Sequence, residues 1–425
     1  MKISSLKSAL QAGALDKYSS IYADTEQAKN RFIHAIDRFT ELYGDGEAEL
    51  FSVPGRSEIS GNHTDHNHGE VLAGAIDRDI IAVARRNDEG IIRFFSEGYP
   101  MDTVELCRCH SPENFTCYTS SSLIAGIVDG LREKGYIAGG CDVYATSDVL
   151  KGSGISSSAA YEVMIGNVQN HLYNGGKIDN KETAKLAQYA ENKFFGKPCG
   201  LMDQMACAVG GFVYINFNNP TSPIVEPIEF SLSDAGYALA IINTGGNHAD
   251  LNEDYASVPR EMKDVAHSLG REVLGDIGEE ELISAIPDLR GRVSDRAILR
   301  ALHFVRENKR VAAAKAALQT SDTDGFFKAV RASGASSFKY LQNVYTTVNV
   351  EEQGLSLALA LADGYLAGKS GAFRVHGGGF AGTVQVFVRK EDLAGLVELM
   401  DSVFGEGATM SLNIRPLGAI KFDLE

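Results

Sequence analysis

Apolar and polar residues alternate along this chain with two different periods. Spacings of three and four residues predict amphipathic helices, whereas short apolar runs bounded by glycine, proline or asparagine predict strands. The first stretch, residues 1–45, is helical in pattern, and its apolar stripe ends at Gly44. After it the two periods follow one another in irregular order, which predicts the α+β fold class.

The first half of the chain mixes short strands with three helices. Strands are expected at 49–53, 71–76, 80–85, 91–95, 141–145 and 212–215. Helices are expected over 120–134, after a Gly/Ser-rich loop near residue 155, and over 181–195. The strand at 49–53 is expected to end at Pro54-Gly55.

The second half is more helical. Helical spacing dominates 253–274, 295–345 and 391–403, and strands are expected at 237–243, 373–375, 384–388 and 411–423. Composition changes near 220–235, which makes that stretch the best candidate for a domain boundary. We therefore expect a helical extension over 1–45, an N-terminal domain over 46–230 and a C-terminal domain over 231–425.

Composition narrows the class of protein. The 425 residues are 44% hydrophobic and 23% charged, as in ordinary globular proteins, and the net charge is -16. An acidic surface repels nucleic acids and anionic membranes, so we expect neither as a partner. No apolar run reaches the length of a membrane span, and the first fifteen residues do not read as a secretory signal. Six scattered cysteines indicate reduced thiols, and the expected location is cytoplasmic.

Candidate chemistry starts at the Gly/Ser-rich loop. Gly152 and Gly154 alternate with small residues, three serines follow, and a helical pattern begins directly afterwards. Free N–H groups and the dipole at a helix N-terminus attract anions such as phosphate. The loop lacks the Gly-Lys-Ser/Thr ending of a Walker motif and the final glycine of a nucleophile elbow. The alternative from these residues alone is a serine-capped helix.

A second polar segment lies at 61–69. His63, Asp65, His66 and His68 are close enough in sequence to form a metal site, although their order matches no common metal motif. Asn, His, Thr and Asp side chains also supply short, directional hydrogen bonds for a sugar, which is the interpretation we favour. Asp203, between two methionines, is expected to be partly buried, or else to cap a helix.

Four segments in order resemble the GHMP small-molecule kinases, and among them the galactokinases. They are Gly55-Arg56-Ser57-Glu58-Ile59-Ser60-Gly61-Asn62-His63-Thr64-Asp65-His66, Gly152-Ser153-Gly154-Ile155-Ser156-Ser157-Ser158-Ala159, Cys199-Gly200-Leu201-Met202-Asp203-Gln204 and Gly377-Gly378-Gly379-Phe380-Ala381-Gly382. Tyr255 and Arg260 also match family positions, and the resemblance covers about 49–425. It implies a two-domain fold, with a ribosomal S5 domain 2-like N-terminal domain, a ferredoxin-like C-terminal domain and the active site between them.

The resemblance also implies ATP, Mg²⁺ and phosphorylation of a sugar at its anomeric hydroxyl, with galactose as the default substrate. Asp203 would take the sugar proton and Arg56 would steady the transition state, in keeping with a reaction that depends on positioning and charge neutralisation. The implied triphosphate cradle is Gly152, Ser153, Gly154, Ile155, Ser156, Ser157 and Ser158, with Ser158 and Glu191 on the metal. The implied sugar site is Asn62, His63, Thr64, Asp65, Gly200 and Tyr255.

Three positions depart from the family signature. Asn62 stands where the signature has Glu, Glu58 where it has Asn, and His66 where it has Tyr. In galactokinases that Glu faces the sugar's 6-hydroxyl, so a carboxamide keeps galacturonate and L-arabinose open as substrates. A sugar sensor without turnover is an alternative of another class, which the intact serine loop and Asp203 disfavour. A metal-dependent hydrolase is a weaker third alternative. No obligate protein partner is evident.

Overall fold

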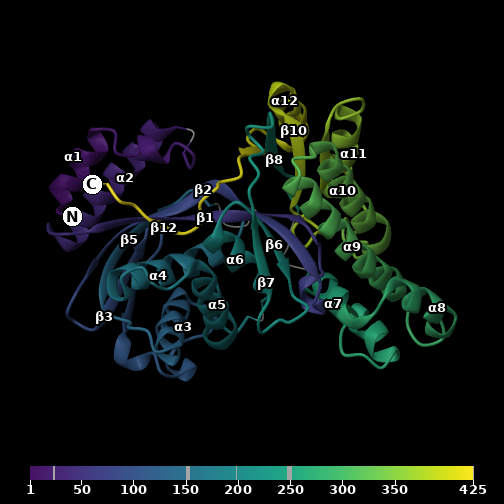
Figure 1. Ribbon diagram of the computed structural model, residues 1–425, viewed down its shortest axis with the longest axis horizontal. Helices are drawn as coiled ribbons and strands as arrows, with labels where there is room; N and C mark the ends of the chain where they lie inside the picture. The colour runs from purple at the N-terminus through teal and green to yellow at the C-terminus, as the bar shows by residue number, and fades with distance from the viewer. Residues whose placement is uncertain (23, 150–153, 198, 247–250, 425) are drawn as a thin grey trace.

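Two β-sheets organise the molecule, and helices cover both of them (Figure 1). The computed structural model describes residues 1–425 except 23, 150–153, 198, 247–250 and 425. Gly152 and Ser153 of the predicted cradle therefore lie outside the described residues. The mixture of helices and antiparallel strands confirms the α+β class.

The first sheet is built around the long strand β2 (Glu70–Arg86), which pairs with β1 (Glu49–Ser60) along one edge. The other edge of β2 pairs with two strands. β5 (Cys141–Ser147) pairs with the second half of β2, and β6 (Phe212–Asn216) pairs with the first half. The remaining strands are β3 (Ile91–Ser96), β4 (Asp102–Glu105), β7 (Ile224–Ile228) and β12 (Ile420–Lys421). Its last strand thus comes from the end of the chain.

The second sheet is antiparallel throughout and has the order β11-β8-β10-β9. Its strands are β8 (Tyr237–Asn243), β9 (Gly371–His376), β10 (Thr383–Arg389) and β11 (Thr409–Leu412). The apolar residues of β8 and β10 alternate between two faces, so both faces need a covering layer.

Helices cover the first sheet on both faces. In Figure 1, α1 (Ile3–Gln11) and α2 (Thr25–Tyr43) lie above the sheet, where Phe32 and Phe39 are buried against Ile81 and Val83. The opposite face carries α3 (Ser120–Glu133), α4 (Ser157–Asn174), α5 (Asn180–Ala190) and α6 (Met202–Val209). The expected extension is therefore part of the core.

The remaining helices cover the second sheet and extend beyond it. They are α7 (Asn252–Ser268), α8 (Glu279–Leu289), α9 (Asp295–Gln319), α10 (Thr323–Ser336), α11 (Gly354–Tyr365) and α12 (Leu393–Phe404). Val311 and Ala314 of α9 belong to the same apolar cluster as residues of both sheets. One continuous core therefore holds the two sheets together.

Several sequence-based boundaries were wrong. Pro54-Gly55 does not end β1 but coincides with a register shift, because Pro54 lacks the N–H that a regular ladder needs. The strands expected at 71–76 and 80–85 are one strand, β2. The strand expected at 411–423 is two short strands in different sheets. Helices α6, α8 and α11 were not predicted. Among the described helices, none is long and apolar enough to cross a bilayer.

Candidate active site

Arg56 and Asp203 form the centre of the site. Arg56 projects from the distal half of β1, and Asp203 lies in the first turn of α6. Arg56 Nε donates to Asp203 Oδ1 and Arg56 Nη2 to Asp203 Oδ2, each at 2.7 Å. Such a two-point pair fixes the relative orientation of guanidinium and carboxylate. The Arg56 side chain is 9% exposed and the Asp203 side chain 32%, so the carboxylate is the part open to a ligand.

The protonation state of Asp203 follows from these neighbours. Burial raises the pKa of the Asp203 carboxyl, but the Arg56 guanidinium and the Ser156 hydroxyl outweigh burial and hold the pKa below its ordinary value. Ser156 Oγ donates a short hydrogen bond to Asp203 Oδ2. Asp203 is therefore a carboxylate at neutral pH.

The serine loop is joined to this pair. Arg56 Nη1 donates to the Gly154 carbonyl at 2.5 Å, and Arg56 N donates to the Ile155 carbonyl at 3.1 Å. A side chain on Gly55 would prevent this approach, because its Cβ would lie 2.8 Å from the Ile155 oxygen. Ser156 precedes α4 with φ 58° and makes no side-chain capping bond to it. Its hydroxyl is used on Asp203, which leaves the first N–H groups of α4 available to an anion.

The segment 63–65 borders the site from the other side. His63 contacts the Gly378 carbonyl through Nε2 at 2.9 Å, and burial lowers the pKa of His63, so the ring is neutral and Nε2 donates. Burial and the nearby Asp203 charge raise the pKa of the Asp65 carboxyl. A Cβ on Gly200 would lie 2.3 Å from Asp65 Oδ2, so glycine lets the two segments meet. Thr64 is fully buried, and its hydroxyl bonds the Gly61 and Glu70 carbonyls.

These groups surround a cavity of about 780 Å³. Of the predicted site residues, those that border it are Arg56, Asn62, His63, Asp65, Gly200, Asp203 and Tyr255. Thr64, Ser158 and Glu191 are not among the described lining residues. Tyr255 of α7 donates its hydroxyl to the Gly379 carbonyl at 2.9 Å and packs edge-on to Phe380. Arg260 instead pairs with Glu253, half exposed.

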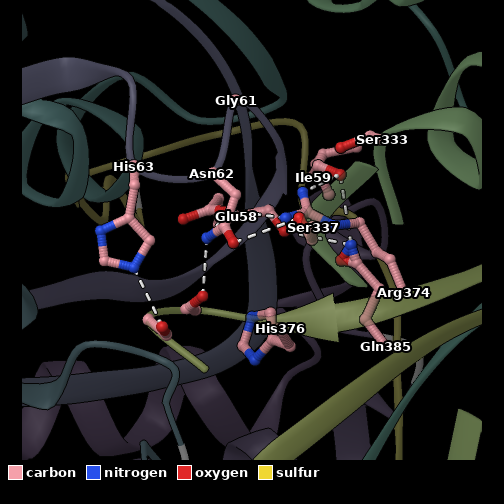
Figure 2. Close-up of polar contacts among 12 residues, drawn as sticks. Glu58, Ile59, Gly61, Asn62, His63, Ser333, Ser337, Arg374, His376 and Gln385 are labelled. Carbon is pink, nitrogen blue, oxygen red and sulfur yellow. Dashed lines mark hydrogen bonds and ion pairs between the residues drawn. The ribbon is translucent and has the colours of Figure 1, made fainter. Parts of the chain in front are cut away.

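Asn62 borders the cavity, and its amide is bonded to Glu58 and Gly377, which border the same cavity. Figure 2 shows its side chain turned toward Glu58 and toward the glycine segment before β10, which His63 also contacts. The residue is only 1% exposed. The sequence had assigned this side chain to the sugar, and that role stays a prediction.

Glu191 lies one layer behind Asp203. It opens a π-helical turn (Glu191–Phe195) and is buried, with Oε1 accepting from Lys197 Nζ at 3.0 Å. Gln204 Nε2 bridges Glu191 Oε2 at 2.7 Å and Glu162 Oε2 at 3.1 Å. Burial and the charge of Glu191 raise the pKa of the Glu162 carboxyl well above its ordinary value. Ser158 is exposed at the start of α4.

No set of three or more His, Cys, Asp or Glu side chains that could hold a metal occurs within the described part of the chain. His63 and His66 do lie together, with ring centroids 5.7 Å apart, but His66 Nδ1 accepts from the Asn67 amide. The metal-cluster alternative for residues 63–68 is therefore not supported.

Some residues of the site were not found from the sequence. Lys197 reaches Glu191, and its charge helps to lower the pKa of Asp203. His376 is buried behind the loop, between Ser57 Oγ at 3.1 Å and Thr383 Oγ1 at 2.9 Å. A lysine before Pro198 and a histidine before three glycines are weak signals, since neither residue type has a fixed spacing from the motifs.

Two family models match the sequence of this chain. Residues 122–211 match the model described as GHMP kinases N terminal domain, and residues 37–86 match the galactokinase galactose-binding signature. The signature match begins at residue 37, inside α2, so it reaches into the segment that was expected to lie outside the resemblance.

Two curated relatives are galactokinases. The galactokinase of Streptomyces coelicolor is 31% identical over 375 residues, which cover 87% of this chain and 92% of that protein. That of Actinobacillus pleuropneumoniae serotype 5b is 30% identical over 356 residues, covering 83% of this chain and 88% of the relative.

Solved structures share the fold. Lactococcus lactis galactokinase complexed with galactose superposes with a TM-score of 0.76 at 24% identity, over 91% of this chain and 98% of that one. Methanococcus jannaschii mevalonate kinase superposes with a TM-score of 0.60 at 16% identity, over 87% and 99% of the two chains. These likenesses confirm the expected GHMP kinase fold.

Proposed function

The chain belongs to the galactokinase family of GHMP kinases, and on this premise we propose that it transfers the γ-phosphoryl group of ATP to the anomeric hydroxyl of galactose. The observation that carries the proposal is the Arg56–Asp203 pair, which joins the serine loop to the wall of the cavity. Asp203 can act on the sugar hydroxyl and Arg56 on a phosphate, and the two side chains form a single hydrogen-bonded unit.

The sugar would lie against His63, Asp65, Gly200 and Tyr255, which border the cavity beside Asp203. Neutral His63 and the Asp65 carboxyl offer directional hydrogen bonds to hydroxyls, and the exposed part of Asp203 faces the same space. This arrangement supports an acceptor hydroxyl held next to the carboxylate.

The transfer itself would form one bond and break one. The anomeric oxygen bonds to the γ-phosphorus, the bond from that phosphorus to the bridging oxygen breaks, and ADP leaves with the electron pair. Asp203 takes the hydroxyl proton. Because the pKa of Asp203 is held low, we infer that it orients the hydroxyl first and accepts the proton late, once Arg56 turns toward the phosphate charge.

The phosphate-binding part fits ATP. The N-terminus of α4 has no acidic residue in its first turn and no side-chain cap, so its N–H groups and dipole suit a triphosphate. Gly154 to Ser158 would form the described part of the cradle. Six free cysteines and the use of ATP agree with a cytoplasmic location.

The donor set also fits Mg²⁺. Ser158 offers a hydroxyl oxygen and Glu191 a carboxylate, which are the hard oxygen ligands this ion prefers. Lys197 now supplies the positive charge on Glu191, and its side chain is 55% exposed, so it is free to move aside. A bound Mg²⁺ would neutralise phosphate charge as the transfer proceeds.

The test is ATP consumption by the purified protein with galactose, galacturonate, L-arabinose, glucose and N-acetylgalactosamine. Galactose is expected to give the highest kcat/KM, with phosphate on the anomeric oxygen by NMR. A higher kcat/KM with galacturonate or L-arabinose would show that this sugar, and not galactose, is the substrate. Absence of turnover with all five sugars would contradict the proposal and favour a sensor.

A further inference from the structure

The Asn62 amide has no hydrogen-bonding capacity left for a ligand (Figure 2). Its Nδ2 donates to Glu58 Oε1 at 3.0 Å and to the Gly377 carbonyl at 2.7 Å. Its Oδ1 accepts from Asn343 Nδ2 at 2.7 Å and from Ser337 Oγ at 3.4 Å. A carboxamide has two N–H groups and two lone pairs, so all four positions are occupied.

Glu58 connects this amide to the second sheet. Its Oε1, which accepts from Asn62, also accepts from Arg374 Nη2 at 3.1 Å. Arg374 lies on β9, is fully buried, and donates through Nη1 to the Ile59 carbonyl at 3.0 Å. Gln385 of β10 donates to the Glu58 carbonyl at 3.0 Å. Strand β1 of the first sheet is therefore bonded to two strands of the second sheet at this point.

Glu58 and Asn62 stand in reverse order relative to the signature, which has Asn at the first position and Glu at the second. The structure brings the two side chains into direct contact. The signature and this chain therefore both carry one carboxyl and one carboxamide side chain at these two positions. In this chain the carboxyl group belongs to Glu58, which pairs with Arg374. Moving Asn62 toward the sugar would leave a buried carboxylate short of a donor, which is costly.

The backbone around Asn62 is bound just as firmly. His303 Nε2 contacts the Asn62 carbonyl at 3.0 Å, and Gly61 N donates to Glu307 Oε1 at 3.0 Å. Both partners are buried residues of α9. The next residue, His63, already borders the cavity. Whatever holds Asn62 therefore sets where the sugar-binding segment 63–65 begins.

We propose that Asn62 is a positioning residue, which holds segment 63–65 through Glu58, Gly377 and Asn343 and does not contact the C6 end of the sugar. The presence of Asn at position 62, where the signature has Glu, then affects how the two sheets are joined. The choice among galactose, its 6-deoxy form and L-arabinose rests on other residues. This inference deepens the proposed function and rests on it.

Asn62→Ala tests the inference by its pattern across sugars. Loss of the amide removes one donor from Glu58 and one acceptor from Asn343, so kcat/KM is expected to fall about 10- to 100-fold through a higher sugar KM, with the ATP KM unchanged. The factor is expected to be the same for galactose, 6-deoxygalactose and L-arabinose. A loss confined to galactose would show that Asn62 reads the C6 hydroxyl and would overturn the inference, as would the absence of any loss.

Asn343→Ala repeats the test from outside the cavity. It removes the side chain that donates to Asn62 Oδ1 and to the Gly378 carbonyl, and Asn343 is not among the described residues that line the cavity, so the same uniform loss is expected even if Asn62→Ala does not fold. An unchanged sugar KM in this variant would contradict positioning through Asn343.

The pair Asn62→Asp and Glu58→Gln supplies a rescue. Each single change leaves a repelling or unpaired group, whereas the double variant keeps one carboxylate in the group by moving it from position 58 to position 62, and it reverses the hydrogen bond between the two side chains. Chemical unfolding of the four proteins is expected to show a non-additive cycle, and sugar KM is expected to recover in part. Additive changes in the free energy of unfolding would show that Glu58 and Asn62 are not coupled and would overturn the inference. This unfolding readout needs no catalysis, so it separates failure of the inference from a protein that phosphorylates none of these sugars.

Discussion

Arg56 and Asp203, 147 positions apart in sequence, are joined by two parallel hydrogen bonds of 2.7 Å. The pair links a strand of the first sheet to the start of a helix, and the serine loop is bonded to both members. With the acceptor at the cavity and the phosphate at the loop, as proposed, this pair would hold the two sides of the site in alignment. Such preorganisation lowers the cost of reaching a charged transition state.

Asp203→Asn is expected to lower turnover by at least ~10²-fold, the low end for lost acid–base catalysis. The amide keeps the shape of the side chain but cannot take the sugar proton, and it presents an N–H to Arg56. The measurement is kcat by coupled ADP release at saturating galactose, with folding checked by circular dichroism. Asp234→Asn, an exposed carboxylate away from the cavity, is the control. Near-normal turnover in folded Asp203→Asn would remove the role assigned to the carboxylate.

The Arg56–Asp203 pair also makes a prediction about pH. Because the pKa of Asp203 is lowered, its carboxylate form persists below the ordinary aspartate value of ~3.9, and no acid loss of kcat/KM should come from Asp203 above about pH 5. The stability that the pair contributes is complete above the unfolded pKa and is lost as pH falls through the lower folded pKa.

Arg56→Gln should move the titration of Asp203 to higher pH. Without the guanidinium, burial raises the pKa of the carboxyl with less opposition. Carboxyl NMR titration of both proteins reports this shift without requiring activity. Identical titration curves would show that Arg56 does not control the charge of Asp203.

The sequence was sufficient for the motifs and for most elements that carry them. Asp203 was expected after a Cys-Gly turn between two methionines, and the structure places it in the first turn of α6, beside the cavity. Glycine, serine and aspartate have strong local preferences, so the loop before α4 and the turn before α6 were recognisable without tertiary information.

The partners of these residues could not be predicted in the same way. Asn62 was assigned to the sugar because it occupies a position of the family signature, yet its partners Asn343 and Gly377 lie 281 and 315 positions away. The same limit applies to β12, a two-residue strand that pairs with β1 only because the chain returns to the first sheet. Local patterns carry no information on such distant pairings.

Arg31 is predicted to stabilise the fold from the N-terminal helices. Arg31 Nη1 of α2 bonds buried Asp79 Oδ1 at 2.8 Å and Asp148 Oδ2 at 2.9 Å, just before the serine loop. Arg31→Gln leaves Asp79 with one cation fewer, so the free energy of unfolding should fall by about 1–3 kcal/mol.

The matched control for Arg31 lies on the same helix. Arg38 makes an exposed pair with Glu41, so Arg38→Gln should change the unfolding free energy by less than about 1 kcal/mol. Urea denaturation compares the two variants, and the ATP KM of Arg31→Gln is expected to rise because Asp148 leads into the loop. Equal stabilities of the two variants would show that the N-terminal helices do not support the site.

Gly200→Ala is expected to raise the sugar KM with little change in the ATP KM. The new Cβ would lie 2.3 Å from Asp65 Oδ2, closer than real Cβ contacts, so the Asp65 carboxyl must move away from the cavity wall. The backbone of Gly200 is not in the left-handed region, so any effect comes from this contact and not from strain. Gly364→Ala, in α11 with open space around the new Cβ, is the matched control and should be neutral or slightly stabilising. Isothermal titration with galactose and steady-state kinetics measure both variants. A wild-type sugar KM in Gly200→Ala would mean that Asp65 does not hold the sugar.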